Sequence, residues 1–144
     1  MYQGKLATSP LHNRFVQAIY KAKILTFYEQ SGEHWNLVKE IQESFPKYKY
    51  NSPAIETDTP VGYLDVCATE KYVYALYSGK NYRDDKDAAF SGYTIEVYGW
   101  DGTLQKRYQS DVPLKVIEVS KDDGSLYAIA YHPDPVLVRF PLNL

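Results

Sequence analysis

The sequence has a single cysteine, little net charge and no apolar stretch of membrane-spanning length. Cys67 is the only cysteine among 144 residues, so no disulfide can form within the chain, and its apolar surroundings predict a small core residue. The formal net charge of −2 gives no basic field for nucleic acid or an anionic membrane surface. No apolar run approaches the roughly 20 residues of a spanning helix. We therefore expect no nucleic-acid partner and no membrane span.

The sequence also lacks the short motifs of common catalytic and cofactor sites. No GxSxG, Walker, dinucleotide-binding or CxxC pattern is present. The histidines at 12, 34 and 132 are far apart and have no zinc-ligand spacing. The run Asp84-Asp85-Lys86-Asp87 lacks the glycine and the distal glutamate of an EF-hand, which favours a solvated loop over a cation site. We predict no cofactor, no metal and no catalytic residue.

What the chain has in excess is tyrosine, with 15 residues, together with a short phrase that recurs. VQAIY at 16–20 returns as VYALY at 73–77 and, in a weaker form, as LYAIA at 126–130. The starts of the three copies, at positions 16, 73 and 126, are 57 and 53 residues apart. Self-similarity at such a period is typical of repeat architectures.

Short apolar-rich runs of strand length surround each copy of the phrase. The three sets of runs are 6–8, 15–20, 24–28 and 35–41; 63–68, 72–77, 93–98 and 104–108; and 114–119, 126–131 and 136–140. Asp101-Gly102 and Asp123-Gly124 are hairpin signals between neighbouring runs. Residues 35–45 also have the spacing of an amphipathic helix, but their counterpart at 104–108 alternates like a strand, which favours a strand for both.

Sets of four antiparallel strands at this period predict an all-β chain made of β-propeller blades. The third set has only three runs, so the chain holds about two and three-quarter blades of a partial propeller. We expect one domain over residues 1–144, with blade-like repeats at about 3–45, 60–111 and 112–142.

The chain resembles the TolB-like six-bladed β-propeller proteins, in a branch found in Bacteroidetes and over their C-terminal blades only. The resemblance lies in GYLDVCAT at 62–69, YVYALYSG at 72–79 and IEVYGWDG at 95–102. It covers residues 60–142 closely and residues 1–45 more loosely. It implies the propeller fold and a place in the cell envelope or periplasm, although the first residues show no signal peptide. It implies no catalytic residues.

The long connections at 46–60 and 79–92 should leave the blades at the same end, and long loops on a rigid scaffold often carry binding sites. We expect ligand contacts there from Tyr82, Arg83 and His132. Tyr63 and Asp65 lie in the strand that lines the channel and are further candidates. The alternative is structural: aromatic residues that cap the core, and an Asp65 that binds backbone donors.

These patterns favour a non-enzymatic binding or assembly module with a protein, peptide or glycan ligand. An incomplete ring exposes sheet faces and an edge strand, so we expect self-association or a partner that completes the propeller. Two alternatives stay open: a channel-centred hydrolase or lyase acting on a sugar or peptide, and a truncated propeller fragment without independent function. A propeller fold alone does not choose between them.

Overall fold

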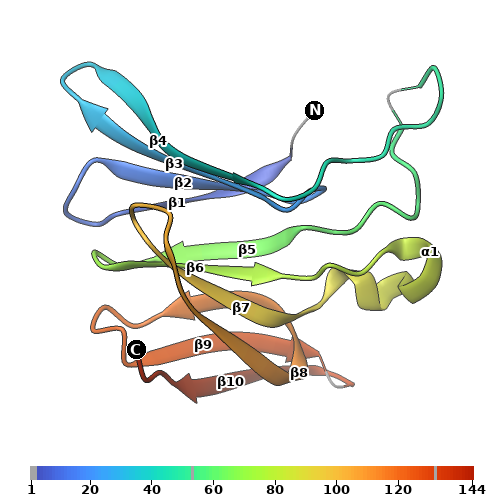
Figure 1. Cartoon of the computed structure of the whole chain (residues 1–144). Helices are drawn as coiled ribbons and strands as arrows, with labels where there is room; N and C mark the ends of the chain where they lie inside the picture. The colour runs from blue at the N-terminus through green and yellow to red at the C-terminus, as the bar shows by residue number, and fades with distance from the viewer. Residues whose placement is uncertain (1–2, 53, 132) are drawn as a thin grey trace.

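The computed structural model describes residues 3–52, 54–131 and 133–144, which form two antiparallel sheets (Figure 1). The first sheet has the order β1-β2-β3-β4 and consists of β1 (Gly4–Thr8), β2 (Arg14–Ile19), β3 (Ile24–Ser31) and β4 (His34–Gln42). The second has the order β10-β9-β8-β7-β6-β5 and consists of β5 (Tyr63–Ala68), β6 (Tyr72–Tyr77), β7 (Gly92–Gly99), β8 (Leu104–Val119), β9 (Ser125–Tyr131) and β10 (Pro135–Pro141). The all-β prediction is confirmed, and residues 35–41 lie in a strand, not in a helix.

Strand β8 belongs to two blades. Its first half pairs with β7 and its second half, from Leu114 to Val119, pairs with β9. The separate strands predicted at 104–108 and 114–119 are therefore one strand of 16 residues. The short link between the two runs stays extended while the pairing partner changes, with register shifts between Gly92 and Thr94 and between Leu114 and Val116.

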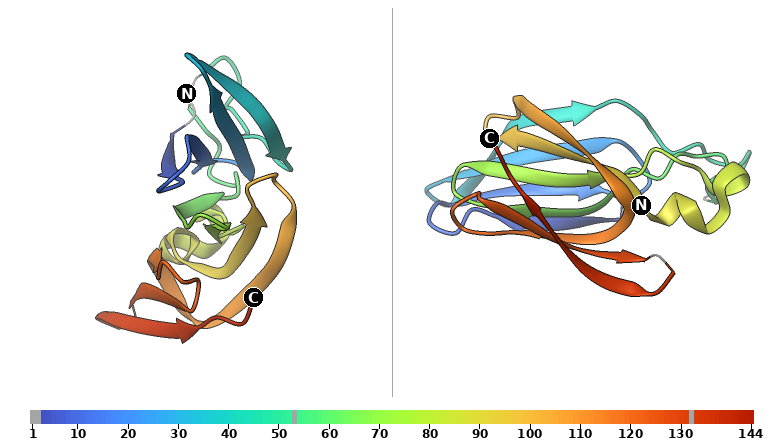
Figure 2. Two further views of the ribbon diagram at one scale, coloured as in Figure 1. Left: turned by 90° about the vertical axis from the view of Figure 1, so that its left-hand side faces the viewer. Right: turned by 90° about the horizontal axis from the view of Figure 1, so that it is seen from below.

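The chain thus makes three stacked blades in a curved arc (Figure 2). The first is β1 to β4, the second is β5 to the first half of β8, and the third is the second half of β8 with β9 and β10. The innermost strands β1, β5 and β8 lie next to one another. Among the described residues the third blade has no fourth strand, as the sequence predicts.

Two apolar clusters join the blades. One lies between the first and second blades and includes Val16, Phe27 and Val73. The other lies between the second and third blades and includes Tyr74 and Leu126. Buried positions of strands β2, β3, β6, β7 and β9 supply most of these clusters, as expected for strands covered on one or both faces.

The recurring phrase lies in β2, β6 and β9, but its alanine does not point to the same side in every blade. Ala75 and Ala128 pack toward the preceding blade, whereas Ala18 packs toward the following one. Because successive side chains alternate between the two faces of a strand, a shift of one residue moves every side chain to the opposite face. Ala18 and Ala75 are therefore not equivalent positions of their blades, because Ala18 lies on the face that Leu76 occupies in the second blade.

The connection from β6 to β7 contains two short helical segments that the sequence pattern does not predict. These are α1 (Tyr82–Asp85) and the 3-10 helix η1 (Lys86–Phe90). The side chain of Asn81 caps α1 by accepting a hydrogen bond from the backbone N–H of Asp84 at 3.0 Å. Neither segment has the length or the apolar character that crossing a bilayer requires.

Candidate functional site

The two long connections lie at the same end of the blades as the short β2–β3 turn, and the β1–β2, β3–β4 and β5–β6 turns lie at the opposite, tight-turn end (Figure 1). The connections also touch each other. The backbone N–H of Arg83 donates to the carbonyl of Thr57 at 2.9 Å, and the N–H of Val61 donates to the carbonyl of Lys80 at 2.8 Å. The loops therefore support each other, which gives this end a defined surface.

A pocket of about 280 Å³ opens between the two connections. Its apolar wall includes Ile55, Val61, Tyr82 and Phe90. The rings of Tyr82 and Phe90 lie with centroids 6.0 Å apart, and Tyr82 is 45% exposed. Of the residues that the sequence singled out, Tyr82 is the one that lines this pocket.

Arg83 is not part of that pocket wall. The guanidinium of Arg83 lies 3.5 Å from the carboxylate of Asp58, which Lys47 also approaches at 3.3 Å. These three side chains form an exposed charged group on the outside of the connection. His132 lies outside the described residues.

The acidic residues of α1 take part in local hydrogen bonds. Asp84 accepts from the side-chain amide of Asn81 at 2.9 Å, and Asp85 accepts from the backbone N–H of Asn81 at 3.1 Å. Across residues 3–52, 54–131 and 133–144, no group of three or more potential ligands could hold a metal ion. These contacts account for the acidic run as part of a helix cap.

Tyr63 and Asp65 both lie on β5, and both are buried. The hydroxyl of Tyr63 donates to Glu96 at 2.9 Å, and burial raises the pKa of this hydroxyl. Asp65 accepts from the backbone N–H of Val66 at 3.0 Å and from that of Ile117 at 2.9 Å. Lys5 on β1 lies 3.5 Å from the same carboxylate. Asp65 therefore links the innermost strands of all three blades, and both of its oxygens have partners.

Glu96 is the buried charge that sequence reasoning missed. It is fully buried between the first and second blades, and Arg107 donates to it at 2.9 Å. Lys23 lies 3.4 Å from the same carboxylate. Burial by itself would raise the pKa of Glu96, but the hydrogen bonds from Arg107 and Tyr63 and the charge of Lys23 bring that pKa below its usual value. The signal that could have identified it is a glutamate within the apolar run 93–98.

The tight-turn end holds a second polar group, built around Glu70. The carboxylate of Glu70 contacts the ring of His12 and accepts from the hydroxyl of Ser9 at 2.9 Å. Arg14 donates to the backbone carbonyl of Glu70 at 3.0 Å and lies over the ring of Trp100. This group fastens the β1–β2 turn to the β5–β6 turn.

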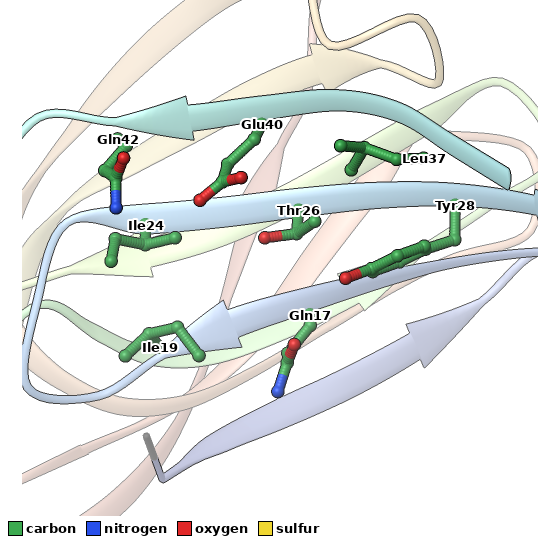
Figure 3. Close-up of a pocket in the computed structure, with 8 residues that line it drawn as sticks. All are labelled: Gln17, Ile19, Ile24, Thr26, Tyr28, Leu37, Glu40 and Gln42. Carbon is green, nitrogen blue, oxygen red and sulfur yellow. The ribbon is translucent and has the colours of Figure 1, made fainter. Parts of the chain in front are cut away.

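The outer face of the first blade is shallowly hollowed. A depression of about 330 Å³ is lined by Gln17, Thr26 and Glu40 among others, which point from neighbouring strands to the same side (Figure 3). An aromatic group borders it, in which Phe15 stacks on Tyr28 at 4.6 Å and meets Trp35 edge-on at 4.8 Å. Polar and aromatic side chains thus share this open face.

The outer face of the third blade is more apolar. Val116, Ile129 and Leu137 stand in one row across β8, β9 and β10. Val116 is 39% exposed and Leu137 is 69% exposed. The corresponding pair in the second blade, Leu76 and Ile95, is 0% and 3% exposed because the third blade covers it. The third blade therefore presents the pattern of a buried face, and among the residues that the structure describes no sheet covers it.

Stacked antiparallel sheets with their first strands side by side define a β-propeller fold, here about two and three-quarter blades of one. The chain belongs to the TolB-like 6-blade propeller-like family, whose model matches residues 16–122.

Among solved structures, the chain is similar to the C-terminal WD40 domain of Sif2, with a TM-score of 0.55 and 10% sequence identity. The similarity covers 96% of this chain and 36% of that chain. At this identity it shows the fold alone. No curated protein matches the chain.

Proposed function

We propose that the chain is a non-enzymatic binding and assembly module built from propeller blades. The observation that carries this proposal is the apolar row of Val116, Ile129 and Leu137 on the outer face of the third blade. Exposed apolar surface in this arrangement favours contact with another sheet, because that contact removes it from water. Either a second copy of the chain or a partner that completes the propeller supplies that sheet.

The ligand face of the module is formed by the connections 46–60 and 79–92. Its support is the pocket between them, with the exposed ring of Tyr82 on the wall, and the exposed ion pair of Arg83 with Asp58 outside that pocket. Tyrosine and arginine are favoured contact residues at binding surfaces. A protein, peptide or glycan is the class of ligand that we expect.

Assembly through the third blade is tested with Ile129→Ser, measured by sedimentation velocity over a range of protein concentrations. We expect the variant to associate about tenfold more weakly than the parent chain, because it loses the centre of the apolar row. Leu11→Ser is the matched control, since Leu11 is 81% exposed at the tight-turn end. Equal association of all three proteins would contradict the proposal.

The ligand face is tested by amide NMR during titration with a panel of short peptides and oligosaccharides. We expect the chemical-shift changes to gather in residues 54–61 and 80–90, and to weaken in Tyr82→Ala. Changes confined to the tight-turn end would contradict the assignment of this face.

The channel-centred hydrolase or lyase has less support. Asp65 is the acidic candidate that it needs, and backbone N–H groups and Lys5 already occupy both carboxylate oxygens.

A further inference from the structure

Strand β10 is an edge strand that carries few of the features that protect sheet edges. One side pairs with β9 without a register shift, and the other side has no partner strand in the part of the chain that the structure describes. The other outer edge, β4, has an irregularity opposite Phe27 and Tyr28 and carries Lys39 and Glu40. Bulges and charges of this kind discourage pairing between edges. Between its terminal prolines β10 reads Val-Leu-Val-Arg-Phe, so it is the less protected of the two edges.

The ladder with β9 determines which backbone groups of β10 point outward. The N–H of Leu142 donates to the carbonyl of Gly124 at 2.9 Å, immediately beyond the pair of Pro141 with Ser125. Bonded and non-bonded pairs alternate along an antiparallel ladder. Leu137 and Arg139 therefore direct their N–H and C=O groups toward the open side, away from β9.

The two prolines of β10 belong to the same outward set. Pro135 lies two positions before Leu137, and Pro141 lies two positions after Arg139. An N–H group at either proline position would point away from β9, so its absence removes no hydrogen bond to β9. They limit the open edge to a short central segment with two free donors. A strand that pairs there must match this short segment.

A second copy of β10 matches it. In an antiparallel pair centred on Val138, Leu137 lies opposite Arg139 of the partner subunit, and the four outward N–H groups all meet carbonyls. Pro135 lies opposite Pro141 of the partner subunit, where neither donor is needed. Val136 lies opposite Phe140 of the partner subunit, which is a favourable aliphatic–aromatic pair, and no arginine faces its own copy.

We propose that β10 is a self-pairing strand, and that a second copy of this chain binds there in antiparallel register about Val138. An apolar groove of about 130 Å³ runs beside the strand, lined by Ile95, Tyr108 and Phe140 among others, and receives side chains of the added strand. The contact is isologous, so it closes as a dimer and does not propagate. This goes beyond the proposed function, because it concerns the edge of β10 and not the outer face of the blade.

The dimer is tested by sedimentation velocity of the full chain and of two variants at one position. Leu137→Pro removes an outward donor in each copy, hence two of the four cross-strand bonds. At about fivefold per bond, we expect the dissociation constant to rise roughly 25-fold. Leu137→Ser shortens the same side chain of the apolar row but keeps the donor, so comparison of the two variants isolates the backbone hydrogen bond. We expect the rise for Leu137→Ser to be at least about fivefold smaller than that for Leu137→Pro.

The register is tested by cysteine cross-linking. Residues opposite each other in a non-bonded antiparallel pair have Cα atoms about 4.5 Å apart, which a disulfide spans. Val138→Cys should therefore give a disulfide dimer on mild oxidation. Arg139→Cys should not, because residue 139 lies opposite Leu137 of the partner subunit and not opposite its own copy. The parent chain should not either, because Cys67 is buried.

The outcomes separate edge pairing from face packing. A chain that stays monomeric at all concentrations, or a dimer that Leu137→Pro leaves intact, overturns self-pairing. Association that Leu137→Ser and Ile129→Ser weaken as strongly as Leu137→Pro also overturns it, because the face would then hold the copies together. If only Leu137→Pro weakens association, the result supports pairing through the edge of β10. It then leaves the outer face of the third blade without support as a contact between two copies.

Discussion

The carboxylate of Asp65 accepts a hydrogen bond from the backbone N–H of Ile117, 52 residues further along the chain, at 2.9 Å. Asp65 is 8% exposed and also bonds the N–H of Val66, while Lys5 lies 3.5 Å away. One side chain of β5 thereby joins the first strands of three consecutive blades. This relationship places Asp65 in the scaffold of the channel wall.

Asp65→Ala should lower the free energy of unfolding by about 2 to 3 kcal/mol, because it leaves the buried N–H of Ile117 without an acceptor. Asp65→Asn keeps one acceptor oxygen and should cost less. Urea unfolding followed by circular dichroism measures both. A loss below about 0.5 kcal/mol for Asp65→Ala would mean that solvent or another group satisfies that donor.

Glu96 makes the stability of the fold depend on pH. Its pKa lies below the usual value in the folded state, although burial opposes this, because Arg107 and Tyr63 donate to its carboxylate. A lowered folded pKa adds stability that is present above the unfolded pKa of about 4.3 and is lost as pH falls through the folded pKa. We expect the urea midpoint of the parent chain to fall more steeply below about pH 4 than that of Glu96→Gln.

All other carboxyl groups are common to those two proteins, so the difference between their pH profiles isolates Glu96. Parallel profiles from pH 7 to pH 3 would contradict a lowered pKa of Glu96 in the folded state.

Gly62 is required where the second blade begins. Its N–H donates to the carbonyl of Tyr20 at 2.6 Å, and a Cβ at this position would collide with the carbonyl of Ala22. Gly62→Ala should destabilise the chain by about 2 to 4 kcal/mol, because backbone on both sides must move. Gly124→Ala is the control, since its Cβ would meet only the side chain of Asp122. Similar thermal midpoints for the two variants would contradict this expectation.

Cys67 should be unreactive in the folded chain. It is 6% exposed, and burial raises the pKa of its thiol, so little thiolate forms near neutral pH. We expect Ellman's reagent to react at least about 100-fold more slowly in buffer than in strong denaturant. Rapid reaction under native conditions would indicate that β5 opens locally.

The strands were readable from the sequence because their signals are local. Alternating apolar residues and Asp-Gly turns identify β6, β7 and β9, and the recurring phrase lies in the second strand of each blade. The helical turn of α1 was missed, because a four-residue segment has too little periodicity to stand out. The continuity of β8 was missed because nothing in its sequence marks where its partner changes.

The candidate sites were less predictable. The exposed ring of Tyr82 follows from its place in a long connection, whereas the burial of Tyr63 and Asp65 depends on strands that arrive from other blades. Glu96 was visible as a charge within an apolar run, but its partners Lys23 and Arg107 come from other strands and carry no shared motif.

The all-β class could be predicted from period-2 patterns and turn residues within a few positions. The repeat and the three strands of the third blade could be predicted from the spacing of the recurring phrase. Which face of each strand is covered depends instead on how the blades stack. The phrase in β2 presents the opposite face to the phrase in β6, so Ala18 and Ala75 both lie in the interface between the first two blades. Burial of these residues, and the open row and edge of the third blade, result from contacts between distant segments that local sequence does not encode.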